Sequence, residues 1–146
     1  MKEVDVTSAI IISAPVNRVA AFSSNPDNAP AWYENIKSVK WISTPPMQVG
    51  SQMAFTAQFL GRKLSYVYEV ALWEPGQKLI MKTADGPFPM ETTYCWEKVN
   101  ETETRMVLRN RGYPSGFSKW IKPLMVFMMK RANTRDLQLL KKIMEQ

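Results

Sequence analysis

The chain has 146 residues, of which 45% are hydrophobic and 22% are charged, and this size supports one domain with a sizeable core. It carries a net charge of +6, no histidine and a single cysteine, Cys95. Without histidine, zinc, copper and haem sites of the usual kinds are not expected, and no imidazole is present to act as a base or nucleophile. We therefore expect no metal or other cofactor. Catalysis, if there is any, would depend on carboxylates, tyrosines, lysines, arginines or serines.

Cysteine content and hydropathy indicate where the protein resides. A lone cysteine forms no intrachain disulfide, which fits a reducing compartment. Residues 1–5 are charged where the apolar core of a signal peptide should begin. The longest apolar run, residues 123–129, is far too short to span a bilayer. These features predict a cytoplasmic protein without stable membrane insertion.

The first third of the chain predicts one strand and two short helices. Residues 3–12 are rich in valine and isoleucine, which favours a strand. Pro15 suits the start of a helix because its missing N–H needs no partner there. Asn25 followed by Pro26 is a second helix start, and this helix should end near Trp32 and Tyr33.

Six further strands are predicted, in residues 36–43, 53–59, 64–72, 79–85, 90–97 and 105–111. Turn sequences separate them, such as the run at residues 74–77 with proline second and glycine third. Apolar and polar residues alternate along them, so one side of each strand should face the interior. The strand at 64–72, for example, should direct five residues inward: Leu64, Tyr66, Tyr68, Val70 and Leu72.

Residues 123–144 predict one long helix, because strong helix formers dominate and no breaker follows Pro123. At about 100° per residue its apolar face comprises Ile121, Met125, Met128, Met129, Ala132, Leu139, Leu140 and Ile143. Asn133 and Asp136 also fall on this face. The favoured interpretation is that Asp136 pairs with a strand arginine, for which Arg109 and Arg111 are candidates. The alternative is that Asn133 and Asp136 look into a cavity and touch water or a ligand.

The predicted interior is rich in methionine and tyrosine rather than in leucine, isoleucine and valine. Methionine adapts to varied apolar partners, and an interior tyrosine needs a partner for its hydroxyl. An ordinary core is one interpretation; we favour an apolar pocket with a few polar tips. The predicted ligand-binding residues are Trp32, Tyr33, Met53, Phe55, Tyr66, Tyr68, Met81, Met90, Tyr94, Trp96, Leu108, Asn110, Met125, Met128 and Met129.

Several motifs resemble those of the START-related superfamily, also called SRPBCC, whose members include polyketide cyclase/dehydratase-like proteins and lipid-transfer domains. They are Ile-Ile-Ile-Ser-Ala-Pro-Val-Asn-Arg-Val at 10–19, Asn25-Pro26-Asp27 followed by Trp32, Val49-Gly50-Ser51, Glu74-Pro75-Gly76-Gln77-Lys78-Leu79, and Arg135-Asp136-Leu137 with Leu140-Lys141. The resemblance covers nearly the whole chain. It implies an α+β helix-grip fold: one START-like domain, residues 1–146, with a curved antiparallel sheet of about seven strands around a long C-terminal helix.

Three functions fit these observations. The first is binding of a small hydrophobic or aromatic ligand, lipid-like or polyketide-like, between the sheet and the last helix. The second is a polyketide cyclase/dehydratase-type enzyme in which tyrosines or arginines orient a carbonyl chain. The third is an interaction module without a ligand. We expect no nucleic-acid partner, because the basic residues of the last helix are best explained as a solvated face. Leu124 and Phe127, on the polar side of that helix, suggest a weak homodimer.

Overall fold

The computed structural model describes residues 3–59, 61–113 and 122–146. The elements follow the predicted order of one strand, short helices, six strands and a long helix. They are β1 (Val4–Ile12), α1 (Val16–Ser24), the 3-10 helix η1 (Pro26–Asn28), α2 (Ala29–Trp32), β2 (Ile36–Trp41), β3 (Gln52–Phe59), β4 (Arg62–Glu74), β5 (Lys78–Asp85), β6 (Met90–Asn100), β7 (Glu103–Gly112) and α3 (Lys122–Met144).

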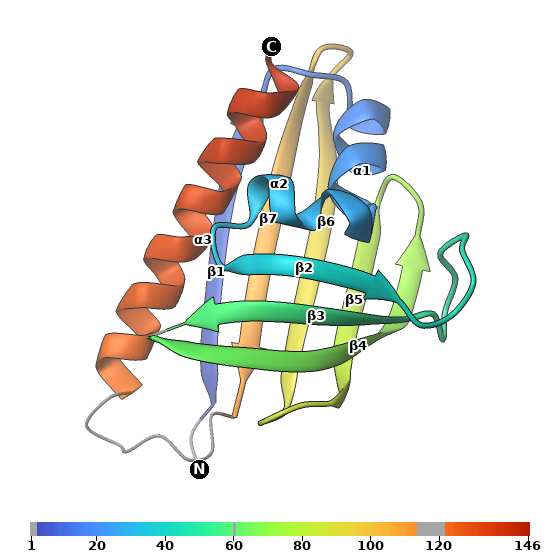
Figure 1. The fold of residues 1–146 in the computed structure, drawn as a ribbon. Helices are drawn as coiled ribbons and strands as arrows, with labels where there is room; N and C mark the ends of the chain where they lie inside the picture. Colours follow the sequence, from blue (N-terminus) through green and yellow to red (C-terminus); the bar gives the residue numbers. More distant parts are fainter. Residues whose placement is uncertain (1–2, 60, 114–121) are drawn as a thin grey trace.

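The strands form one antiparallel seven-stranded sheet in the order β1-β7-β6-β5-β4-β3-β2. Strands β2 to β7 form a meander, and β1 joins its far edge, with Val4 opposite Gly112 and Ile12 opposite Thr104. The sheet bends so strongly that β2, β3 and β4 cross in front of β5, β6 and β7, and α3 lies along β1 (Figure 1). The expected α+β helix-grip architecture is therefore confirmed.

Local chemistry explains two of the connections. Between β4 and β5, the Gln77 N–H donates to the Glu74 carbonyl at 2.9 Å, and Gly76 has a φ of +77°, which an L side chain rarely adopts. At the start of η1, the Asn25 side chain accepts from the Asp27 N–H at 3.1 Å, and Pro26 follows it directly. Both connections were expected from the residue types.

The inward alternation of β4 fails at one position. Register shifts between Val70 and Leu72, where Val70 lies opposite Met81 but Leu72 lies opposite Ile80. Because such a shift exchanges the two faces of a strand, Trp73 packs against the core in place of Leu72. The prediction that Leu72 faces inward is wrong for this reason.

The main core fills one half of the space inside the sheet. Helix α1 packs there against β6 and β7, and α2 lies between β2 and α3, which itself packs along β1 (Figure 1). The residues with no more than 1% exposure in this cluster are Ile12, Val19, Trp32, Met53, Val70, Leu79, Met106, Leu108, Leu137 and Leu140. The helices therefore fill this half of the concave side of the sheet. The other half of the concave face lies against the first turns of α3.

The buried side of α3 is turned relative to the predicted apolar face. Asn133, Asp136, Leu137 and Leu140 are all at most 3% exposed, whereas Leu139 is 39% exposed. Met128 lies on the same flank of the helix as Leu139 and is half-buried. The expectation that Leu139 packs inward is wrong, because the sheet covers the side that carries Asn133 and Leu137.

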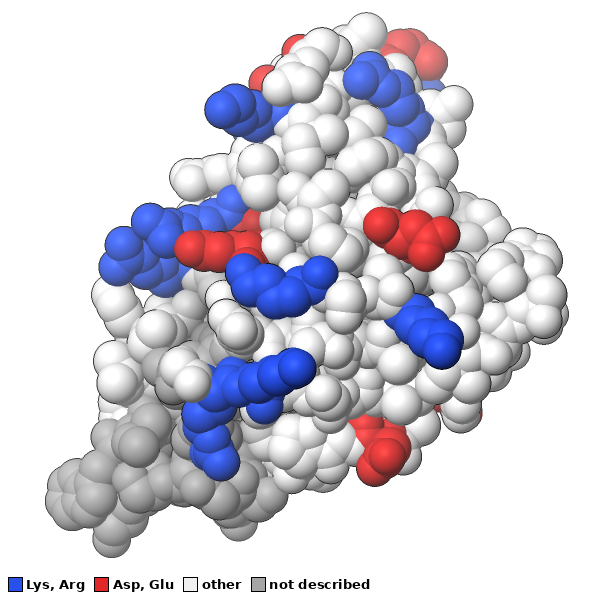
Figure 2. Space-filling model, in the orientation of Figure 1, with Lys and Arg blue, Asp and Glu red and all other residues white. Residues whose placement is uncertain are grey.

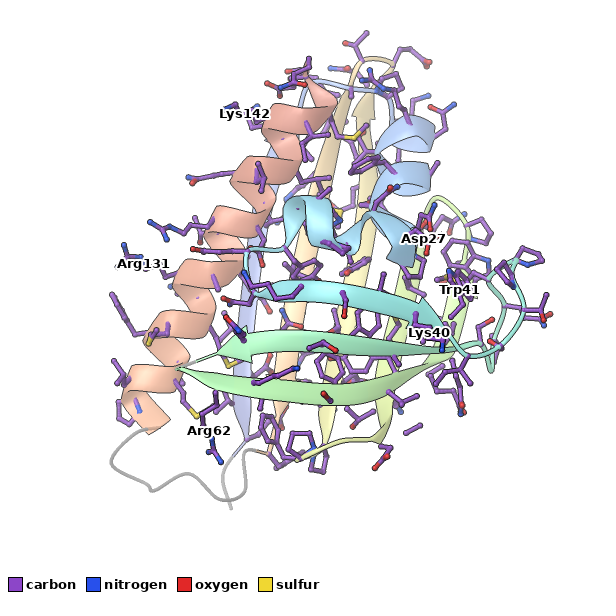
Figure 3. All side chains as sticks on the ribbon, in the orientation of Figure 1. Asp27, Lys40, Trp41, Arg62, Arg131 and Lys142 are labelled. Carbon is purple, nitrogen blue, oxygen red and sulfur yellow. The ribbon has the colours of Figure 1, made fainter. Side chains whose placement is uncertain are left out.

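Basic side chains are spread over the face formed by α3 and by β2, β3 and β4 (Figure 2). Arg131 and Lys142 point away from the sheet on the outer side of α3, and Lys40 extends from β2 (Figure 3). One cation of this face, Arg135, pairs with Glu34 at 3.2 Å. Leu124 and Phe127 are 52% and 62% exposed on the same helix.

Candidate ligand cavity

A cavity of about 150 Å³ lies between the concave face of the sheet and the N-terminal half of α3. Every strand contributes to its wall, because the bent sheet brings one end of each strand to the same region. Its apolar lining consists of Val4, Ile36, Phe55, Ala57, Leu64, Met81, Phe88, Met90, Met125, Met129 and Ala132. An apolar cavity of about 150 Å³ accommodates a molecule the size of benzene.

Most of the predicted ligand-binding residues meet at this cavity. Those that line it are Tyr33, Phe55, Tyr66, Tyr68, Met81, Met90, Tyr94, Asn110, Met125 and Met129. The strand residues among them share the concave face because side chains of one parity point to the same side of a sheet. That these residues bind a ligand stays a prediction.

Five predicted residues do not line the cavity. Trp32, Met53, Trp96 and Leu108 are inward-facing as expected, but they belong to the filled half of the core. Met128 lies at the edge of the inner face of α3, turned about 60° from Met125 at the usual 100° per residue. Alternation identifies the inner face but does not show which part of that face the helices cover.

Aromatic rings form one wall of the cavity. Phe55 stacks on Tyr66 with centroids 5.5 Å apart, and Tyr66 meets Tyr68 edge-on at 5.0 Å. Tyr33 packs on the buried Trp32 at 4.3 Å, so the end of α2 closes the cavity on the side of the core. Such a wall suits a flat apolar ligand, since aromatic pairs favour stacked and edge-on geometry.

The tyrosine hydroxyls remain protonated at neutral pH. Tyr33 and Tyr94 share a hydrogen bond of 2.6 Å, and the Tyr68 hydroxyl lies 2.7 Å from Thr92 Oγ1. Burial raises the pKa of Tyr68 to about 12 and raises the pKa values of Tyr33, Tyr66 and Tyr94 above their usual range. These groups therefore act as neutral hydrogen-bonding groups and not as bases.

Asp136 faces the cavity and does not pair with a strand arginine. Its Oδ1 accepts the Glu34 N–H at 2.9 Å, and burial raises the pKa of the carboxyl to about 7. Arg109 instead pairs with Asp5, and Arg111 pairs with Glu91 and Glu3. The favoured salt-bridge interpretation was therefore wrong, and Asp136 is a carboxyl group that exchanges its proton near neutral pH.

Sequence reasoning left Asn133, Thr92 and Asp136 out of the predicted ligand-binding residues, although all three line the cavity. The signal for Asn133 and Asp136 was their position on the apolar face of the helix. Thr92 offered no comparable signal, because threonine is common at both faces of a strand. Its role becomes visible only through its bonds, since Thr92 Oγ1 donates to Asn110 Oδ1 at 2.6 Å.

Among the described residues that line the cavity, Arg111 is the cationic one. Its Nε lies 2.8 Å from Glu91 Oε2 and 3.3 Å from Glu3 Oε1. Two carboxylates offset its charge, so the wall offers little attraction to an anionic ligand.

Other kinds of site find no support in the described ranges. Among residues 3–59, 61–113 and 122–146, no three histidine, cysteine, aspartate or glutamate side chains gather closely enough to hold a metal ion. Over the same ranges, no helix combines the length and the apolar character needed to cross a bilayer.

Solved structures with the same fold include enzymes and a START protein. The Zhui aromatase/cyclase from a Streptomyces species superposes with a TM-score of 0.83 at 11% identity, over 99% of this chain and 94% of that one. A Thermus thermophilus protein superposes with a TM-score of 0.81 at 18% identity, with 94% of each chain covered. A START superfamily protein from Mycobacterium smegmatis gives 0.73 at 14% identity, over 97% of this chain and 94% of that one. These identities show a shared fold alone.

A search of curated proteins finds no match to this sequence. The model of one family, described as polyketide cyclase/dehydrase and lipid transport, matches residues 3–145. That match covers almost the entire chain and agrees with the curved sheet, the long helix and the cavity between them. The chain therefore belongs to the polyketide cyclase/dehydrase and lipid transport family.

Proposed function

We propose that this protein binds a small hydrophobic molecule, aromatic or lipid-like, between the sheet and α3. The observation that carries the proposal is the cavity of about 150 Å³, whose wall is mainly apolar and aromatic. Pockets of this composition bind small molecules through apolar contact, and a few polar groups set the orientation. The description of the family, with its lipid-transport members, supports the same function.

Thermal unfolding with a panel of aromatic and lipid probes tests this proposal. A ligand that binds only the folded state at a hundredfold excess over its Kd should stabilise the protein by about 2.7 kcal/mol. Phe55→Ala should weaken the binding, whereas Phe127→Ala, on the exposed side of α3, should leave it unchanged. If no probe across the panel shifts the unfolding transition, the proposal is wrong.

A second candidate is a cyclase/dehydratase-type enzyme, which Asp136 specifically favours. A carboxyl group with a pKa of about 7 accepts and returns protons at neutral pH, as general acid–base catalysis of carbonyl chemistry requires. With a polyketide-like substrate, Asp136→Asn should abolish turnover and retain binding. No turnover by the wild-type protein would leave ligand binding as the function, whereas retained turnover in the variant would show that Asp136 is not the catalytic group.

The location and assembly of the protein are further proposals. The free Cys95 is consistent with a reducing compartment such as the cytoplasm. The exposed Leu124 and Phe127 offer apolar area for a weak homodimer, which sedimentation equilibrium of the wild type and of Phe127→Ser would reveal.

A further inference from the structure

Asp136 is a buried carboxyl group without a cationic partner among the described residues. It lies in the second half of α3, is 3% exposed and lines the cavity. Its Oδ1 accepts the Glu34 N–H at 2.9 Å, and no described residue donates to Oδ2. Buried carboxylates in proteins are normally paired with a cation. Asp136 therefore carries a negative charge, when ionised, that the described part of the protein leaves without an opposite charge.

The second oxygen of Asp136 is open to the cavity. Some side-chain atoms of the described residues, such as Asn133 Nδ2, are fully enclosed by protein and have no hydrogen-bond partner. Asp136 Oδ2 also has no partner, but it is not one of these enclosed atoms and so retains accessible surface. The open space that Asp136 lines is the cavity. A ligand group inside the cavity can therefore reach this oxygen.

Tyrosine side chains lie near this carboxyl group. Tyr33, directly after α2, and Tyr94, on β6, share a hydrogen bond of 2.6 Å. Burial raises the pKa of both hydroxyls, and the charge of Asp136 raises each pKa further, so the carboxyl group lies within electrostatic range of both. Tyr68 acts on Tyr94 in the same way and adds a third ring. The face of an aromatic ring attracts a cation, most strongly where water is excluded.

The rest of the described cavity lining adds no net positive charge. Arg111 is its cationic residue, and this side chain pairs with both Glu91 and Glu3. An ionised Asp136 therefore makes the charge at the cavity negative. Such a cavity attracts a cation and repels an anion.

We propose that the cavity binds a small arylalkylamine, whose ammonium group pairs with Asp136 Oδ2 beside the rings of Tyr33 and Tyr94. This inference rests on the proposed function, since it names the chemical class of the hydrophobic ligand. The apolar wall covers the hydrocarbon part of such a molecule, and the ammonium group supplies the cation that Asp136 lacks. A neutral hydrocarbon leaves the carboxylate unpaired, and an organic acid meets a like charge.

Three probes with the same ring system separate these cases. Indane is neutral, 2-aminoindane carries an ammonium group, and indane-2-carboxylic acid carries a carboxylate. Titration calorimetry of the wild-type protein at pH 8 should give 2-aminoindane a Kd about tenfold lower than that of indane, as expected for a hydrogen bond between charged groups. The carboxylate should bind most weakly of the three.

The variant Asp136→Asn removes the charge and keeps the side-chain shape. It should raise the Kd of 2-aminoindane at least tenfold, because the buried ammonium group loses its partner, and it should change the Kd of indane far less. Asp27→Asn, at an exposed position of η1, is the matched control and should keep the preference for the amine. If the wild type prefers indane to 2-aminoindane, or if Asp136→Asn binds the amine as well as the wild type does, the inference is overturned while ligand binding stands. If indane does not bind either, the proposed function is contradicted as well.

The pH dependence of binding is a second test, made on the wild-type protein. Among the described residues, the titratable groups that face Asp136 are Glu34, which pairs with Arg135, and the neutral hydroxyls of Tyr33 and Tyr94. Burial raises the pKa of Asp136 to about 7, so protons compete with the ammonium group below neutral pH. The Kd of 2-aminoindane should therefore be about tenfold higher at pH 6 than at pH 8, whereas that of indane should not rise. Equal affinity for the amine at the two pH values would contradict its pairing with Asp136.

Discussion

Asp136 shows how one residue makes stability depend on pH. Its pKa is about 7 in the folded protein and 3.8 when unperturbed, because the cavity wall excludes water from the carboxylate. Between these values the folded state holds a proton that the unfolded state has released. The contribution of Asp136 to stability is therefore fully present below about pH 4, is lost as the pH rises to about 7, and stays lost above that. The negative charge of Glu34 raises the pKa of Asp136 further, and the hydrogen bond from the Glu34 backbone N–H lowers it.

The variant Asp136→Asn should remove this pH dependence. At about 1.4 kcal/mol per pKa unit, the difference between 3.8 and about 7 means that ionising Asp136 lowers the free energy of unfolding by roughly 4 kcal/mol. The amide oxygen of the variant still accepts from the Glu34 N–H, so the variant should be more stable than the wild type at pH 8 by that amount. Urea unfolding from pH 4 to pH 8 measures the difference.

The exposed Asp27, which accepts from Trp41 Nε1 at 3.1 Å (Figure 3), provides the control Asp27→Asn. This control should keep the loss of stability between pH 4 and pH 7. An unchanged slope in Asp136→Asn would show that another group dominates the titration.

Individual residues show which contacts can be predicted from the sequence and which cannot. Tyr66, Tyr68 and Tyr94 were assigned to the interior because strand parity is a local property, and the structure places all three at the cavity. The partner of Asp136 was assigned wrongly, because it depends on contacts between distant segments. Its hydrogen bond comes from the backbone of Glu34, in the connection between α2 and β2. Arg109 and Arg111 of β7 pair instead with Asp5 and Glu91 on the neighbouring strands β1 and β6.

At the scale of the element, α3 combines a buried face with a flank that the sheet does not cover. Composition alone predicted its length well, with an end at Met144 as observed. Its orientation was predicted less well, because leucine and methionine occur on both sides and only packing decides which side is covered. Likewise, the alternation of apolar and polar residues along β4 did not predict the register shift beside Leu72.

Two adjacent leucines of α3 test this orientation. Leu140 is fully buried, so Leu140→Ala should lower the free energy of unfolding by about 2 to 5 kcal/mol through lost contacts and a new void. Leu139 is 39% exposed, so Leu139→Ala should cost less than about 1 kcal/mol. Both changes keep good helix formers, so helix propensity does not confound the comparison. Equal costs in guanidinium unfolding would mean that α3 packs in a different rotation.

For the whole molecule, the uneven filling of the sheet creates the site. Helices α1 and α2 and the end of α3 fill one half, and the first turns of α3 span the other half without filling it. Sequence patterns predicted a hollow from its flexible methionines and its tyrosines. They placed it between the sheet and the last helix but did not show which half of that space stays open, because this depends on where three helices rest against one bent sheet.

Filling the cavity should separate stability from ligand binding. Ala132 lies on α3 and lines the cavity, so Ala132→Leu adds apolar atoms to empty space rather than to a packed core. Burying the added carbons should stabilise the ligand-free protein by about 1 kcal/mol, and the reduced volume should weaken binding of indane at least tenfold. Ala84→Leu, on an exposed position of β5, is the matched control and should change neither property. A destabilised Ala132→Leu that still binds indane would mean that the ligand occupies a different place. If Ala132→Leu is more stable than the wild type and no longer binds indane, the open cavity lowers the stability of the ligand-free protein. Such a loss of stability is what a binding function requires.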